Sequence, residues 1–277
     1  MVEALIQYEF LQNAFFTGIL IGIIAPLLGV FIVVRRLSLI ADALSHVTLA
    51  GIAASLLLEK RFLGVTSLSP LYMGMVFSVA GSLFIEKLRS IYKHYQELAI
   101  PIILSSGIGL SIIFISLADG FNVDLFSYLF GSVSAVSRAD LWAILFITLG
   151  VMITVFLLYK ELFLLSFDEE HAIASGIRAK TLHFVFIVLV ALVIAASMRI
   201  VGILLVSSLM TLPVAASIRL AKSFKQAIVF SIVFAEVSII AGLILSYYLD
   251  LAPGGTIVLL AVLILVIVIA WKKWRRG

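Results

Sequence analysis

Long apolar stretches alternate with short polar connections along the whole chain. A transmembrane helix needs about 20 predominantly apolar residues, with a range of roughly 17 to 25. Stretches that meet this requirement cover residues 11–34, 39–58, 68–85, 98–118, 140–159, 181–198, 200–218, 226–249 and 256–271. The sixth and seventh of these meet at Met198-Arg199, so a division into eight spans is also open. The pattern predicts an all-α, polytopic integral membrane bundle with eight to nine transmembrane helices.

The composition agrees with a chain that lies mainly in a bilayer. Of the 277 residues, 64% are hydrophobic and 12% are charged, and a soluble protein of this length could not remove so much apolar surface from water. No segment resembles a soluble domain or a linker, so we expect one transmembrane domain over residues 1–277. The first residues include Glu3 and Glu9 rather than a basic cluster, and we therefore expect no cleavable signal peptide.

Basic residues predict the orientation, because cytoplasmic loops of membrane proteins carry an excess of Lys and Arg. If the loop with Arg35 and Arg36 is cytoplasmic and nine spans alternate, 15 of the 19 basic residues lie inside. The remaining 4 lie outside, at Lys60, Arg61, Arg138 and Arg199. The chain then starts outside and ends in the cytoplasm. Its net charge of +4 follows from this topology, without any need for nucleic-acid binding.

The second span carries a carboxylate and an imidazole on one face. Asp42 and His46 are four residues apart and therefore share a side of a helix, and Ser38 and Ser45 fall on the same arc of about 100°. Ionisable groups inside a span are costly to bury and usually face a cavity or an ion path. The chain has no cysteine, so a metal site must use His, Asp, Glu, carbonyl oxygen or water. Asp together with His suits a divalent ion such as zinc or manganese.

The sequence allows more than one interpretation of the other polar residues within the spans. Ser207 and Thr211 in the seventh span are candidates to line a path, although hydroxyls also bond to carbonyls of their own helix. Glu236, near the middle of the eighth span, is a candidate proton site, a second ion ligand, or a residue paired with a serine. For Asp42 and His46 the alternative is a structural pair that is hydrogen-bonded to neighbouring helices.

Two segments between spans predict short helices at the membrane surfaces. Residues 121–132 are too few to cross a bilayer, and they suit an interfacial or re-entrant helix on the outer face. Residues 166–180 place acids early and Gly176 late, which is typical of the first turn and the end of a helix. We expect a cytoplasmic helix of about two turns there, of the kind that docks a soluble motor.

The three remaining histidines and Arg199 are expected to be exposed to solvent or to the membrane surface. His94, His171 and His183 lie in or beside cytoplasmic segments, where solvated histidines are the default. Arg199 is expected to extend its side chain to the outer interface.

A nucleotide site is not expected in this chain. The Lys180-Thr181 pair matches the last two residues of the P-loop motif. The glycines that this motif requires are replaced by Ala174 and Ala179. Energy for transport must therefore come from a partner or from an ion gradient.

Several of these stretches together resemble the membrane permease subunit of zinc and manganese ABC importers, the ABC-3 family of metal-ion permeases. The stretches that carry the resemblance are residues 35–46 with Gly51, residues 126–132, the acidic loop that runs to Gly176, residues 201–213, and residues 250–255. They extend from the second span to the last, and the segment around Asp42 and His46 is the most specific. Glu236 has no counterpart in the family pattern.

The resemblance implies a type II ABC importer-like permease in a bacterial plasma membrane. It implies a homodimer in which each copy binds a cytoplasmic ATPase subunit, while an extracytoplasmic metal-binding protein delivers the ion. Asp42 and His46 are the implied metal ligands. The implied coupling helix covers about residues 168–178 and includes Asp168, Glu169, Glu170, His171, Ala174 and Gly176. The cargo is expected to be Zn²⁺ first and Mn²⁺ second, with ATP on the partner and no prosthetic group.

Alternative functions are a secondary transporter driven by protons or sodium, with Glu236 and Asp42 as coupling carboxylates, and an ABC permease for cobalamin or iron chelates. A membrane-embedded hydrolase is disfavoured because no nucleophile and base have a usable spacing. Asp and His serve zinc and manganese equally well, so the residues do not separate these two ions.

Overall fold

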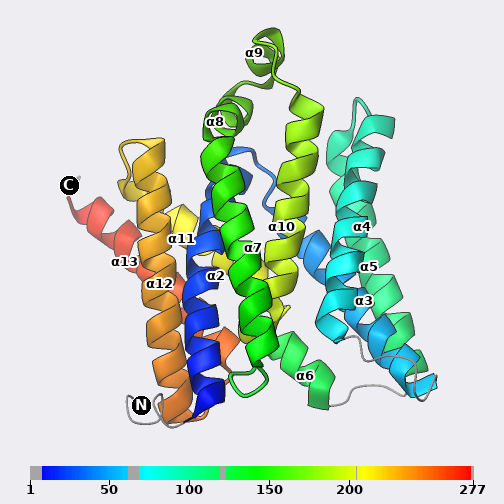
Figure 1. Ribbon diagram of the computed structural model, residues 1–277. Coiled ribbons are helices and arrows are strands. Elements are labelled where there is room, and N and C mark those ends of the chain that lie inside the picture. The colour runs from blue at the N-terminus through cyan, green and yellow to red at the C-terminus, as the bar shows by residue number, and fades with distance from the viewer. Residues whose placement is uncertain (1–7, 62–68, 119–122, 204, 276–277) are drawn as a thin grey trace.

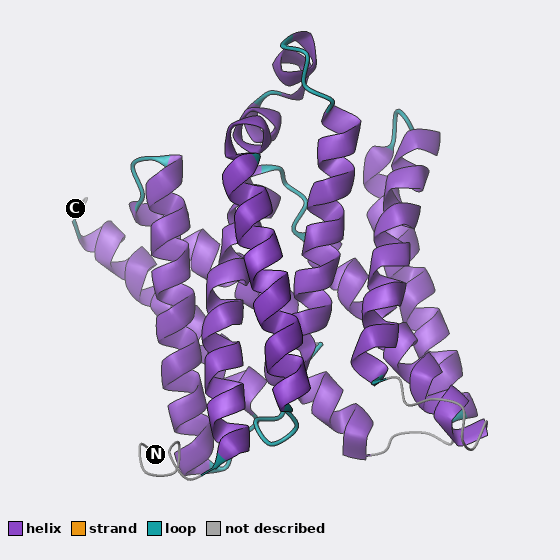
Figure 2. Ribbon diagram, in the orientation of Figure 1, coloured by secondary structure: helices purple, strands orange, loops and turns teal. Residues whose placement is uncertain are grey.

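The computed structural model describes residues 8–61, 69–118, 123–203 and 205–275. Within these ranges the chain forms helices and connecting loops and no strand (Figure 2). The helices stand side by side in one bundle, with short connections at its two ends (Figure 1). We refer to the end that carries α9 as the α9 end, and to the opposite end, which carries α6, as the α6 end.

Eight helices of the described chain are long and apolar enough to cross a membrane. They are α2 (Glu9–Val34), α3 (Leu39–Arg61), α4 (Pro70–Ile91), α5 (Ala99–Leu117, preceded by the 3-10 turn η1, Gln96–Leu98), α7 (Arg138–Leu157), α10 (Ala179–Val201), α12 (Phe224–Leu249) and α13 (Pro253–Trp274). The shorter helices are α6 (Val123–Phe130), α8 (Tyr159–Phe167), α9 (Glu169–Ala174) and α11 (Val206–Leu220). The prediction of an all-α polytopic bundle is confirmed. The helix ends lie within three residues of the expected ones except at the end of α4 and the start of α11, which each lie six residues later.

The seventh predicted span differs from the others in length. Its counterpart α11 has 15 residues and is therefore about 22 Å long, shorter than the hydrocarbon core of about 30 Å. It begins where α10 ends, at the α6 end, and it ends where α12 begins, at the α9 end (Figure 1). The bundle thus contains eight helices of span length and one short traverse among its described residues.

The break between the sixth and seventh predicted spans lies at Gly202 rather than at Met198-Arg199. Gly202 has φ +84°, a conformation that favours glycine. A Cβ at this position would overlap the carbonyl oxygen of Leu129 in α6. The next residue, Ile203, donates its backbone N–H to the carbonyl of Tyr128 at 2.9 Å. This contact fastens α6, the expected helix at the membrane surface, to the end of α10; residues 121 and 122 of that prediction lie outside the described ranges.

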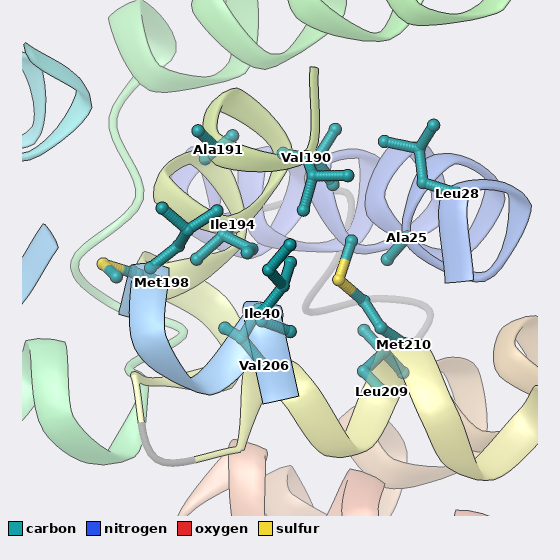
Figure 3. Close-up of a cluster of buried hydrophobic side chains, with 14 of the residues drawn as sticks. Ala25, Leu28, Ile40, Val190, Ala191, Ile194, Met198, Val206, Leu209 and Met210 are labelled. Atoms are coloured by element: carbon teal, nitrogen blue, oxygen red, sulfur yellow. The ribbon is translucent and has the colours of Figure 1, made fainter. Parts of the chain in front are cut away.

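The centre of the bundle is an apolar core. Figure 3 shows side chains of α2, α3, α10 and α11 that point toward one another; those labelled are Ala25, Leu28, Ile40, Val190, Ala191, Ile194, Met198, Val206, Leu209 and Met210. All ten belong to the buried core. Ile40 is 1% exposed and lies in the first turn of α3. The helix that carries Asp42 and His46 is therefore anchored in the core two residues before the aspartate.

Arg199 forms an ion pair inside the protein, at the α6 end, that the sequence did not lead us to expect. Its guanidinium donates to Asp140 Oδ2 at 2.8 Å, to the hydroxyl of Tyr128 at 2.9 Å and to the carbonyl of Ala135. The same Asp140 oxygen accepts hydrogen bonds from the backbone and hydroxyl of Ser137, which caps α7. This pair was not predicted because the sequence does not show that Asp140, at the start of α7, lies beside the end of α10.

Candidate metal site

Asp42 and His46 lie on the same side of α3, both half-buried. The two side chains are close enough to interact electrostatically. His46 Nδ1 is buried and has no hydrogen-bond partner, and Asp42 forms no hydrogen bond with the described part of the chain. Buried polar atoms are normally hydrogen-bonded, so an orphan nitrogen beside a carboxylate calls for a ligand. An imidazole nitrogen and a carboxylate fit a divalent transition-metal ion.

The preceding turn fixes the start of α3. Helix α2 ends in a Schellman motif, in which Leu37 N–H donates to Ile32 O at 2.9 Å and Arg36 N–H donates to Val33 O at 3.0 Å. Arg36 occupies the left-handed position with φ +58°, where glycine is usual. Helix α3 then begins at Leu39 and presents Asp42 in its first turn.

Neighbouring helices hold α3 at the level of the two candidate ligands. A Cβ on Gly107 of α5 would lie 2.8 Å from Val47 N and 3.0 Å from His46 C, so the backbones of α5 and α3 touch at this point. Helix α4 packs along the following turns, where a Cβ on Gly51 would lie 2.7 Å from Met73 O. These close approaches leave α3 little freedom to rotate.

The other polar residues that are candidates for the ion path differ in their burial and in their hydrogen bonds. Ser38 is exposed just before α3, whereas Ser45 is 2% exposed and donates its hydroxyl to Ala41 O at 2.8 Å. Ser207 and Thr211 are half-buried on α11, which packs against α3, and Thr211 donates to Ser207 O at 2.9 Å. The structure therefore brings the α11 hydroxyls to a neighbouring helix, and it assigns two of the hydroxyls to carbonyls of their own helices.

Glu236 lies away from Asp42 and His46 within the protomer. Helix α12 packs on α2, α11 and α13, and its described residues make no packing interface with α3. The Glu236 carboxylate faces Gly22 of α2, where a Cβ would lie 2.6 Å from Oε1. This oxygen is buried without a hydrogen-bond partner. The structure thus places Glu236 against α2 rather than against the helix that carries Asp42.

The acidic connection between α7 and α10 forms two helices. Asp168 ends α8 and caps α9, and its side chain accepts a hydrogen bond from His171 N–H at 2.8 Å. Gly176 has φ +84° beyond the end of α9. The expected helix over about 168–178 is thus a six-residue helix, Glu169–Ala174, bounded by the predicted acid and glycine. Phe167 and Ile173 are 60% and 56% exposed on this projecting segment.

His183 is buried rather than solvated, and it connects α9 with the end of α2. It is 5% exposed, the guanidinium of Arg35 lies against its ring, and Glu169 Oε1 lies 3.8 Å from its Nε2. Burial and the neighbouring Arg89 lower the pKa of Arg35 to about 10. The expectation failed because Arg35, 148 residues earlier, supplies the partner. No local sequence signal marks this contact.

The described residues do not complete a metal shell by themselves. No three His, Asp or Glu side chains in these ranges are grouped to hold an ion. A zinc site usually has four ligands, of which Asp42 and His46 supply two. Within the described residues, the further ligands available are hydroxyl and carbonyl oxygens, and water or groups from another chain can add to them.

Comparison with known proteins identifies relatives over almost the full length. Residues 7–272 match the ABC 3 transport family. The chain is 37% identical over 273 residues to a protein of Treponema pallidum named "Probable metal transport system membrane protein", with 99% of each chain covered. It is 36% identical over 264 residues to the manganese transport system membrane protein MntC of Listeria monocytogenes, covering 95% of this chain and 91% of that protein.

A solved structure has a similar fold. The match is to a chain of PsaBC from Streptococcus pneumoniae in complex with Fab, with a TM-score of 0.83 and 32% sequence identity. It covers 96% of this chain and 93% of the other. The arrangement of helices described above is therefore that of an ABC permease.

Proposed function

This chain belongs to the ABC 3 transport family, and from that premise we propose that it is the permease subunit of an ATP-driven importer that moves Mn²⁺ into the cytoplasm. The observation that carries the proposal is the Asp42–His46 pair, half-buried on a membrane helix, with an imidazole nitrogen that has no hydrogen-bond partner among the described residues. A travelling cation would compensate the carboxylate and occupy the free nitrogen.

Manganese takes the place of zinc as the first candidate cargo. The expectation of zinc is not confirmed, since the Listeria relative is named for manganese and the Treponema relative for metal alone. The ligand types do not oppose manganese, because carboxylate suits it and imidazole is common to both ions. Zinc remains the second candidate.

The α9 end faces the cytoplasm in this proposal, and α8 with α9 seats in the ATPase subunit. Support comes from the distribution of basic residues, most of which lie in connections at this end, and from the exposed apolar side chains Phe167 and Ile173 on the projecting segment. Asp168, Glu169, Glu170, His171, Ala174 and Gly176 form or bound the docking helix. ATP binds to the partner, since Ala174 and Ala179 replace the P-loop glycines here.

The importer contains two copies of this chain, and an extracytoplasmic protein delivers the ion at the α6 end. A second copy supplies the missing ligands if Asp42 and His46 of each copy lie near a two-fold axis. Water and the hydroxyls of Ser38, Ser207 and Thr211 are further candidates for the path.

The test is uptake of radioactive manganese by cells that express the chain with its ATPase and binding protein. Asp42→Asn and His46→Gln keep the side-chain size and remove a ligand atom. Each should reduce uptake by about tenfold or more, because even groups that only orient metal ligands contribute about 10- to 100-fold. Glu97→Gln and His94→Gln alter exposed residues at the α9 end and should keep normal uptake. Normal uptake by both site variants, with the complex assembled, would overturn the proposal.

A secondary transporter is the second candidate, because Glu236 Oε1 is buried and unpaired as in a proton-coupling carboxylate. Reconstitution of the chain alone in vesicles separates the two functions. A proton gradient would drive manganese uptake into these vesicles in the second case and not in the first.

A further inference from the structure

A cavity of about 570 Å³ lies at the α9 end between α4 and α10. These two helices pack against each other along the bundle (Figure 1). The cavity is lined by Leu83, Glu86, Lys87, Arg89, Ser90, Lys93, Gln96, Glu169, Lys180, His183 and Phe184. It does not contain Asp42 or His46, and the proposed metal path does not use it.

The lining has the same polarity on both helices. On α4, Leu83 is 42% exposed and Lys87 follows it one turn nearer to the α9 end. On α10, which runs in the opposite direction, Phe184 is 43% exposed and Lys180 lies one turn nearer to that end. Residues four apart on a helix share a face. Each of the two helices therefore contributes an apolar side chain nearer to the middle of the bundle and an ammonium group one turn closer to the α9 end.

Positive charge predominates inside the cavity. Four basic side chains line it, at Lys87, Arg89, Lys93 and Lys180, against the two acids Glu86 and Glu169. Each acid forms only a long ion-pair contact. Glu86 Oε2 lies 3.9 Å from Arg89, and Glu169 lies 3.8 Å from His183.

A further cation lies behind the cavity wall. Arg35 contacts His183, and its Nη1 is buried without a hydrogen-bond partner. Burial and then repulsion from Arg89 lower the pKa of Arg35 to about 10, and the nearby Glu169 and Glu86 offset this only in part. A phosphate in the cavity would supply the negative charge that the protein leaves out.

We propose that the cavity between α4 and α10 binds an anionic phospholipid, with its headgroup phosphate among Lys87, Lys93 and Lys180 and its acyl chains along Leu83 and Phe184. Basic pockets between transmembrane helices at the cytoplasmic surface are suited to such headgroups. A free phosphate has no acyl chain that could contact the exposed side chains of Leu83 and Phe184. An acidic protein surface would not reach residues that lie one turn deeper. The proposal depends on membrane insertion and not on the identity of the cargo.

The test is native mass spectrometry of the purified full-length chain, titrated with phosphatidylglycerol or with phosphatidylcholine of the same acyl chains. The test variant is K87Q/K93Q/K180Q. The matched control, K222Q/K225Q/K273Q, removes the same charge from exposed lysines elsewhere at the α9 end. Wild type and control should prefer phosphatidylglycerol by about tenfold or more, and the test variant should lose that preference, since each basic residue near an anionic surface contributes several-fold. All three proteins should share one thermal midpoint, because the altered lysines are exposed.

Three results would overturn the proposal. Equal affinity of the test and control variants for phosphatidylglycerol would remove the cavity as the site. Full displacement of the lipid by inorganic phosphate at millimolar concentration would make the ligand a free anion. Loss of ATPase association in the test variant, with lipid affinity unchanged, would make the surface part of the ATPase interface.

Discussion

At the residue scale, two ion pairs near the start of α7 differ in burial. Arg138 pairs with Glu9, and these side chains are 73% and 57% exposed. Asp140 pairs with Arg199, and these side chains are 6% and 16% exposed. An exposed pair is screened by solvent and contributes about 0–1 kcal/mol. A buried charge that loses its partner is left uncompensated, which costs about 3–5 kcal/mol.

The same substitution at the two arginines should therefore have different effects. Arg199→Leu should lower the thermal midpoint of the detergent-purified protein strongly, because the Asp140 carboxylate stays buried with only the hydrogen bonds from Ser137. Arg138→Leu should change the midpoint little. Similar shifts for both variants would show that the Asp140–Arg199 pair is solvated in the membrane protein.

At the element scale, the junction of α6 with α10 depends on a glycine. Gly202 has a positive φ, and a Cβ there would overlap Leu129 O. Gly202→Ala should destabilise the fold by about 1–3 kcal/mol or more from backbone strain alone. Gly150→Ala is the matched control, because Gly150 is helical and has no atom within 4 Å of an added Cβ. The control should keep or slightly raise the thermal midpoint. Equal midpoints would mean that the junction can separate without cost.

The α9 segment is the element that should transmit ATPase motion. Ile173 is 56% exposed, and Ile173→Glu places a charge in a surface that we expect to be buried by the ATPase. Co-purification of the ATPase subunit should fall by about tenfold or more, since a buried unpaired charge costs several kcal/mol. Leu251→Glu alters a residue of similar exposure, 51%, at the α6 end and should leave co-purification unchanged. Retention of the ATPase by the Ile173 variant would exclude α9 from the interface.

Local patterns in the sequence predicted the helices and the Asp42–His46 pair, because both depend on spacing within one segment. They failed where a distant residue decides the environment. Arg199 marks a polar break in an apolar run, yet Asp140, 59 residues earlier, neutralises it, so α10 continues to Val201. His183 is buried because the chain returns Arg35 to its side. Contacts of this kind arise only when the whole bundle is packed.

At the scale of the whole molecule, the described part of one chain offers too few ligands for the proposed cargo. Asp42 and His46 provide one carboxylate and one imidazole, and no third His, Asp or Glu of the described residues joins them. Glu236 lies on α12, which packs on α2 and not on α3, and it forms no three-residue group with Asp42 and His46. A closed pair of copies would bring together two carboxylates and two imidazoles if α3 lies near the two-fold axis.

This arrangement predicts one high-affinity manganese site per pair of chains. Titration of the purified permease with Mn²⁺, followed by the electron paramagnetic resonance signal of the free ion, should saturate at one ion for two chains. A mixed pair, isolated with two affinity tags, should lose the site when only one copy carries Asp42→Ala and His46→Ala, because both copies supply ligands to the same ion. A mixed pair with Glu97→Gln and His94→Gln in one copy should bind normally. Saturation at one ion per chain, with half of the binding kept in the first mixed pair, would show that each copy completes its own site with water and hydroxyl ligands.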